Sequence, residues 1–109
     1  MDVMQRIQSV LDAHPIVLFM KGTPQFPMCG FSSRASLCLK NVGAVFHSVN
    51  VLEDPEIRAN LPQYANWKTF PQLYVHGELI GGSDIVADLE TSGELKRMVD
   101  EARVQAGAA

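Results

Sequence analysis

Amphipathic and uniformly apolar stretches alternate along the first half of the chain. Helical spacing of apolar residues predicts a helix over residues 2–13, which the His14-Pro15 pair ends. Residues 16–20 are all apolar, as in a strand buried on both faces. Glycine and proline predict a loop over residues 21–28. From Gly30 the helical pattern returns, with a core-facing stripe formed by Ala35, Cys38, Leu39 and Val42.

The second half predicts three further helices and three short strands. Residues 45–51 predict a strand, and Asp54-Pro55 supplies an N-cap acceptor and first-turn proline for a helix that Pro62 is expected to kink or shorten. Residues 72–75 and 78–80 predict strands joined by a hairpin turn. After a break in the pattern, Ser83-Asp84 can cap a helix that Gly93 interrupts. The remaining elements are a terminal helix through Ala102 and an end that we expect to fray over residues 105–109.

This order predicts an α/β protein with a small mixed sheet of four strands and helices on both faces. The length of 109 residues fits one domain, so we expect a single domain over residues 1–109. Length excludes a two-domain enzyme with its own large cofactor-binding fold. An apolar fraction of 47% disfavours intrinsic disorder.

Charge and hydropathy narrow the expected partners and location. A formal net charge of −3 and a pI of about 5.5 argue against nucleic acid as the main partner. The longest apolar run, Ile16–Met20, is too short to cross a membrane, and the N-terminus lacks the basic start of a signal peptide. We therefore expect a cytoplasmic protein without a membrane partner, whose cysteines are thiols at rest.

The chain has two cysteines, too few for a disulfide framework, a four-cysteine zinc site or a self-sufficient iron–sulfur site. Cys29 lies where a loop meets a helix, and there the helix dipole and the charge of Lys21 favour the thiolate. Cys38 occupies the core-facing stripe and is expected to pack there. Because Ser32 stands where a dithiol oxidoreductase needs its resolving cysteine, any redox cycle requires an external thiol.

Four segments of the chain, taken together, resemble the monothiol glutaredoxins. The first pairs Lys21-Gly22-Thr23-Pro24 with Cys29-Gly30-Phe31-Ser32. The others are residues 54–58, residues 67–75 (similar to the family's Trp-Pro-Thr-Phe-Pro-Gln-Leu segment) and residues 81–84 (similar to its Gly-Gly-Cys/Ser-Asp turn). They occur in family order and spacing. Two positions depart from the pattern: Lys68 replaces a proline, and Ser83 stands where many members have cysteine.

The resemblance implies a thioredoxin-like fold, glutathione binding and a role with a [2Fe–2S] cluster. It makes Cys29 the cluster ligand and active thiol, and Pro71 a cis-proline facing that thiol. It assigns glutathione contacts to Lys21, Arg58, Phe70, Ser83 and Asp84. Such residue types suit a tripeptide with two carboxylates and one ammonium, because cations and helix N-terminal amides bind carboxylates and Asp84 accepts from the ammonium.

Each of these residues also has an ordinary structural explanation. Lys21 and Arg58 could be solvated charges, Asp84 a helix-start acid and Ser83 a cap. Aromatic residues at 67 and 70 could belong to the core, and Pro71 could be a turn proline. The three histidines lack metal-ligand spacing and are interpreted as structural or exposed: His14, His47 and His76.

Ligand counting favours one function over its alternatives. A [2Fe–2S] cluster takes four thiolates, and each chain offers one exposed ligand, Cys29. A homodimer offers two, and two glutathione thiols complete the set. The favoured hypothesis is a glutathione-dependent scaffold or carrier that delivers [2Fe–2S] clusters to recipient proteins, with BolA-like proteins as partners that the resemblance implies. The alternatives are an iron-status sensor and, at most, a weak monothiol glutathione-dependent oxidoreductase that removes glutathione from mixed disulfides.

Overall fold

A four-stranded sheet organises residues 1–105, the part of the chain that this computed structural model describes. The strands are β1 (Ile16–Met20), β2 (His47–Asn50), β3 (Gln72–Val75) and β4 (Glu78–Gly81), in the order β2-β1-β3-β4. β1 pairs in parallel with β2 and antiparallel with β3, and β4 returns antiparallel to β3. The mixed sheet predicted from the sequence is confirmed.

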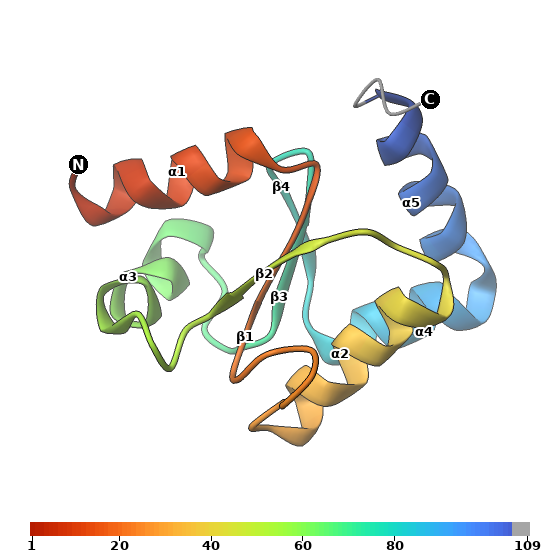
Figure 1. The fold of residues 1–109 in the computed structure, drawn as a ribbon, viewed down its shortest axis with the longest axis horizontal. Coiled ribbons are helices and arrows are strands. Elements are labelled where there is room, and N and C mark those ends of the chain that lie inside the picture. Colours follow the sequence, from red (N-terminus) through yellow and green to blue (C-terminus); the bar gives the residue numbers. More distant parts are fainter. Residues whose placement is uncertain (106–109) are drawn as a thin grey trace.

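Helices cover both faces of this sheet, as predicted. They are α1 (Val3–Ala13), α2 (Gly30–Asn41), α3 (Pro55–Ala65), α4 (Ser83–Ser92) and α5 (Glu94–Gln105). Figure 1 shows α1 and α3 to the left of the sheet and α2, α4 and α5 to its right. The frayed end was expected to begin at Gln105, which is the last residue of α5; residues 106–109 lie outside the described part.

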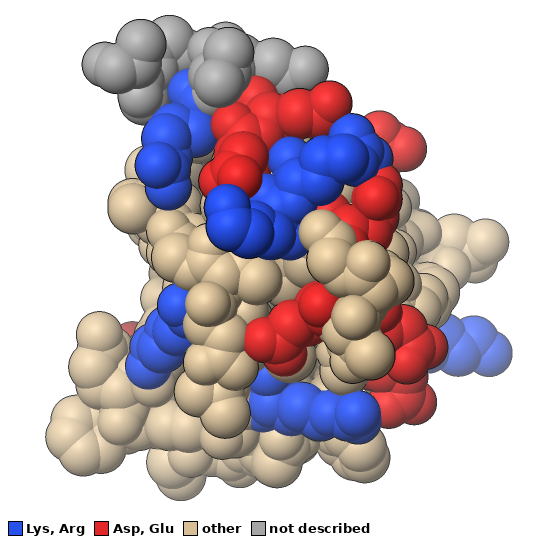
Figure 2. Space-filling model, turned by 90° about the vertical axis from the view of Figure 1, so that its right-hand side faces the viewer, with Lys and Arg blue, Asp and Glu red and all other residues tan. Residues whose placement is uncertain are grey.

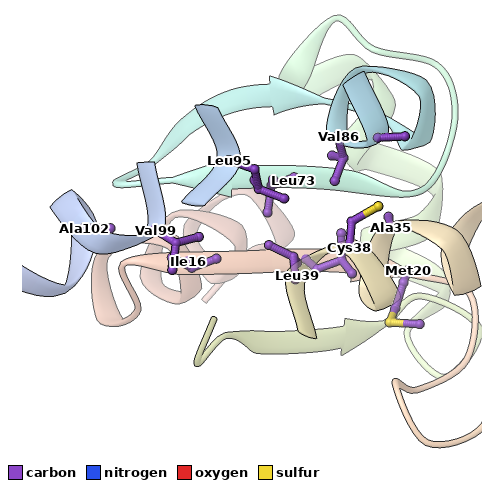
Figure 3. Close-up of a cluster of buried hydrophobic side chains, with 12 residues drawn as sticks. Ile16, Met20, Ala35, Cys38, Leu39, Leu73, Val86, Leu95, Val99 and Ala102 are labelled. Atoms are coloured by element: carbon purple, nitrogen blue, oxygen red, sulfur yellow. The ribbon is translucent and has the colours of Figure 1, made fainter. Parts of the chain in front are cut away.

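The sheet separates two hydrophobic cores. Alternate side chains of β1 point to opposite faces, so Leu18 joins the core beneath α2, α4 and α5, whereas Phe19 joins the core beneath α1 and α3. Figure 3 shows the first core, where Cys38 lies between Ala35 and Val86. Cys38 is 5% exposed, which confirms its predicted place in the core.

Two local predictions need correction, those for β2 and for Ser83. β2 is shorter than residues 45–51, since Val45 is 85% exposed and this edge strand pairs only with β1. Pro62, which was predicted to kink or shorten α3, lies inside the helix three residues before its end, and its carbonyl accepts from the Trp67 N–H at 3.0 Å. Ser83 is not a cap: Gly82 occupies the N-cap of α4 and Ser83 is its first helical residue.

Charged side chains of both signs interleave over α5. Figure 2 shows these blue and red side chains on the upper half of the face it views. Lys96 pairs with Asp100 at 2.8 Å, and Arg97 pairs with Glu94 and Glu101. Within residues 1–105, no helix is long and apolar enough to cross a membrane.

Candidate functional site

Cys29 is the N-cap residue of α2, at the junction that the sequence predicted. Its carbonyl accepts from the Ser33 N–H at 2.9 Å, which begins the helix, and its half-buried side chain closes no capping hydrogen bond. The N–H dipole of Ser32 is the main cause that lowers the pKa of the Cys29 thiol. The Phe31 amide and the charge of Lys21 add to it, and burial opposes them. The first turn of α2 therefore favours a thiolate at this position.

Cys38 has the opposite environment. Burial, together with the nearby carboxyl of Glu90, raises the pKa of its thiol to about 11. Both cysteines are free thiols. Each chain therefore presents one thiol whose pKa is lowered and one whose pKa is raised.

The loop that precedes Cys29 is closed on itself by backbone contacts. The Met28 N–H donates to the Lys21 carbonyl at 2.9 Å, and Gly22 forms an isolated antiparallel bridge with Pro27. The Gly22 N–H also donates to Oδ1 of Asn50 at 3.0 Å, which ties the loop to the end of β2. Sequence analysis missed Asn50, because its partner lies 28 positions away in the chain.

A second loop, between α3 and β3, faces the cleft that contains Cys29. The Phe70–Pro71 peptide bond is cis, as the resemblance implied. Nε2 of the buried Gln72 donates to the carbonyls of Trp67 and Thr69, at 2.8 and 3.3 Å, and its Oε1 accepts from the Tyr74 hydroxyl at 2.9 Å. One buried amide thus fixes this loop to the sheet, a role that the sequence analysis did not anticipate.

All six predicted site residues line one cleft of about 840 Å³: Lys21, Cys29, Arg58, Phe70, Ser83 and Asp84. α2 and α4 supply one side of the cleft, and α3 with its following loop supplies the other. Two polar atoms in this wall are buried without a hydrogen-bond partner, Nε1 of Trp67 and Oγ of Ser83. The cleft also includes Lys68, which sequence analysis singled out only as a departure from the family pattern.

Positive charge predominates around the cleft. Lys21, Arg58 and Lys68 line it, whereas Asp84 is the only acidic residue that lines it in the described part of the chain. Oδ1 of Asp84 pairs with Nη1 of Arg34 on α2 at 3.1 Å, in an ion pair exposed to solvent. An anionic ligand with a single ammonium would match this charge distribution.

Arg58 lies on α3, and a bidentate ion pair between Asp54 and Arg6 holds the start of that helix against α1. Asp54 caps α3 by accepting from the Ile57 N–H at 3.2 Å, and its two oxygens also accept from Arg6 of α1 at 2.9 and 3.1 Å. The Arg6 hydrogen bonds are the largest cause of a lowered pKa at Asp54. This junction fixes α3, and with it Arg58, relative to α1.

A smaller hollow of about 380 Å³ lies elsewhere and is lined by none of the predicted site residues. His14 and His47 contribute to it, and their rings stack with centroids 3.9 Å apart. The described part of the chain contains no group of three or more His, Cys, Asp or Glu side chains that could hold a metal ion.

Comparison with known proteins shows the family to which the chain belongs. The Glutaredoxin family model matches residues 16–80. The chain is 48% identical over 101 residues to Glutaredoxin 4 of Haemophilus influenzae (strain 86-028NP), covering 93% of this chain and 94% of that protein. It is 51% identical over 96 residues to Monothiol glutaredoxin-S11 of Oryza sativa subsp. japonica, covering 88% of this chain and 20% of that protein.

Solved structures of glutaredoxins have the same fold as this chain. Reduced apo GrxS14 from poplar superposes with a TM-score of 0.80 at 45% identity, over 94% of both chains. A buckwheat glutaredoxin–glutathione complex superposes with a TM-score of 0.79 at 28% identity, over 90% of this chain and 87% of that one. The chain belongs to the glutaredoxin family. The thioredoxin-like fold is confirmed, and the single cysteine of residues 29–32 is the monothiol form of the active-site motif.

Proposed function

We propose that the cleft binds glutathione, as the buckwheat relative does. Asp84 accepts from the ligand's ammonium, which belongs to the γ-glutamyl residue. The adjacent γ-glutamyl carboxylate then lies at the N-terminus of α4, near the amides of Ser83 and Asp84. The glycine carboxylate at the other end of the ligand is left for Lys21 and Arg58. Backbone groups at Phe70-Pro71 pair with the peptide as an added strand.

The ion pair between Arg34 and Asp84 is compatible with this assignment. Arg34 bonds only Oδ1, which leaves Oδ2 for the ammonium. An exposed pair of this kind is worth about 1 kcal/mol or less, so it competes weakly with a ligand.

We further propose that the bound glutathione and Cys29 together hold a [2Fe–2S] cluster as cargo for recipient proteins. The observation that carries this proposal is the contrast between the two thiols, since Cys29 favours the thiolate while Cys38 is buried in the core. Thiolates are the ligands that such clusters require. One usable thiol per chain calls for a homodimer and two glutathione thiols. Ligands from a small molecule can depart, which suits delivery to recipient proteins or exchange with BolA-like partners.

Anaerobic reconstitution with iron and sulfide tests this proposal. With glutathione present, we expect a coloured dimer by absorbance and native mass measurement; without glutathione we expect a colourless monomer. Cys29→Ser should lose the colour, and Cys38→Ser is the matched control that should keep it. A colourless wild-type protein under both conditions would contradict the cluster function.

Glutathione-dependent thiol–disulfide exchange is the second candidate, favoured by the lowered pKa of Cys29. The Cys29 thiolate would attack the glutathione sulfur of a mixed disulfide and release the other thiol. A second glutathione thiolate would then attack the Cys29–glutathione disulfide and release oxidised glutathione. Ser32 offers no thiol for an internal resolving step.

A turnover assay separates the two candidates. Wild-type protein is supplied with glutathione and a glutathionylated model peptide, and release of the peptide thiol is followed over time. If the protein is a cluster carrier, the peptide thiol should be released slowly. The rate should be about the same for apo protein that has never carried a cluster and for apo protein that has lost one. Rapid multiple turnover by a protein that forms no coloured dimer would favour the oxidoreductase.

A further inference from the structure

Lys68 lines the cleft at a position where the resembling segment of monothiol glutaredoxins has proline. The exchange could have disturbed the loop that leads to Pro71. In this structure Lys68 is exposed and lines the cleft beside Trp67 and Thr69. A residue that departs from the family pattern therefore lies beside the proposed ligand pocket.

The Gln72 amide anchors the loop on both sides of Lys68. Its Nε2 binds the carbonyl of Trp67 on one side of Lys68 and the carbonyl of Thr69 on the other. These bonds fix the backbone from outside, so its course does not depend on the side chain at position 68. The Lys68 side chain consequently acts as an added charge on a fixed loop.

Among the described residues, the Lys68 ammonium has no acidic partner. No ion pair of the described residues involves Lys68, Lys21 or Arg58, although all three line the same cleft. The one acidic lining residue, Asp84, comes from α4 and is already paired with Arg34. Lys68 instead comes from the loop that follows α3, the helix that carries Arg58.

We infer that Lys68 is a specificity-determining residue that binds the glycine carboxylate of glutathione together with Lys21 and Arg58. The inference rests on the proposed glutathione site and adds a third cation to its glycine end. A lysine ammonium on a flexible stem reaches a carboxylate without demanding a fixed geometry. Because the contact is exposed to solvent, we expect it to contribute about three- to fivefold in affinity.

A ligand-by-variant cycle isolates this contact. Glutathione and its glycine monoethyl ester, which lacks the negative charge at that end, are titrated into wild-type protein, Lys68→Pro and Lys68→Gln. Trp67 lines the cleft and is the only tryptophan of the chain, so its fluorescence reports binding. Lys96→Gln on α5 removes the same charge away from the cleft and is the matched control.

We expect both Lys68 variants to raise the Kd for glutathione about three- to fivefold at low salt and to leave the Kd for the ester unchanged. Lys96→Gln should change neither value. Equal losses for both ligands, or no loss for glutathione, would overturn the role of Lys68 while leaving the glutathione site intact. If wild-type protein binds neither ligand, the proposed function fails and this inference fails with it.

Discussion

The hydroxyl oxygen of Ser32 accepts a hydrogen bond from the backbone N–H of Lys21 at 3.0 Å. Ser32 is fully buried, and it ties the end of β1 to the first turn of α2. Ser32 occupies the position where a dithiol enzyme has its second cysteine, and in this chain it stabilises the fold instead. It holds together the two segments that supply the cation and the thiol of the site.

Ser32→Ala should destabilise the protein by about 1–2 kcal/mol, because it leaves the Lys21 N–H without its acceptor. It should also raise the pKa of the Cys29 thiol, since the Ser32 hydroxyl helps to lower it. Urea denaturation and the pH dependence of thiol alkylation measure the two effects. Ser36→Ala is the control: Ser36 is buried on the same helix, but its hydroxyl bonds only the Ser33 carbonyl within α2. Equal behaviour of the two variants would refute the structural role of Ser32.

The two cysteines should alkylate at very different rates. At pH 7, iodoacetamide should label Cys29 and leave Cys38 unmodified, because only Cys29 has a lowered pKa. Labelling of Cys29 should rise with pH to a midpoint below that of a free thiol, and Lys21→Gln should move this midpoint upward. Mass spectrometry of each single cysteine variant reports the rates. Comparable labelling of both thiols in the folded protein would contradict the assigned environments.

Gly22→Ala should open the loop before Cys29. A Cβ atom at Gly22 would lie 2.5 Å from the Phe26 carbonyl oxygen and 2.6 Å from the Met28 nitrogen, and the residue has φ of +90°. We expect a loss of about 2–3 kcal/mol in stability and weaker glutathione binding. Gly43→Ala is the matched control, since it shares a positive φ of 73° but meets no atom within 4 Å. Should both variants lose the same stability, backbone strain alone would account for the effect.

Gln72→Ala should release the loop between α3 and β3. It leaves the Tyr74 hydroxyl and the carbonyls of Trp67 and Thr69 without their partner, at a cost of about 2–3 kcal/mol. It should also weaken glutathione binding, measured by titration. Tyr74→Phe removes one bond of the same amide but keeps the loop attached, so it should affect stability and spare binding. Unchanged binding in Gln72→Ala would show that the loop is held by other contacts.

Acid should weaken the junction between α1 and α3. The pKa of Asp54 is lowered in the folded protein. The ionised carboxylate therefore adds to the free energy of unfolding at pH values above the ordinary pKa of a carboxyl, and this stabilisation is lost as the pH falls through the lowered pKa. Asp54→Ala should cost about 1–2 kcal/mol at pH 7, because it removes both the helix cap and the ion pair with Arg6. The difference from wild type should shrink below about pH 4. Denaturation at pH 7 and pH 3 measures it, and a constant difference would contradict the ion pair as its source.

The sequence predicted the elements whose signals are local. Asp54 next to Pro55 marks the start of α3, and the junction of a proline-rich loop with a helical stripe places Cys29 at an N-terminus. Ser83 shows the limit of such signals, because a serine beside Gly82 resembles a cap although the chain begins α4 one residue earlier. The resemblance, rather than periodicity, predicted the cis bond before Pro71.

Contacts between distant segments were not predictable. Asn50 holds Gly22, 28 positions away, through a bond that exists only once β1 and β2 lie side by side. Gln72 is close in sequence to Trp67 and Thr69, but no helix or strand pattern indicates that its side chain turns back to bind their carbonyls. Neither side chain is charged. Gln72 lies in the segment that resembles the family, but the resemblance assigned it no role. The structure gathers the six predicted site residues around one cleft, while their contacts with glutathione remain a proposal.

The cleft takes its walls from helices that pack on opposite faces of the sheet, and therefore on different hydrophobic cores. Cys29 and Asp84 belong to helices over one face of the sheet, whereas Arg58 belongs to a helix over the other. A substitution that enlarges one core acts directly on the helices over that face of the sheet, and so on one wall of the cleft, because close-packed interiors transmit strain to their neighbours. The spacing between thiol and cation can therefore drift during evolution through interior changes alone, with every residue that faces the ligand kept.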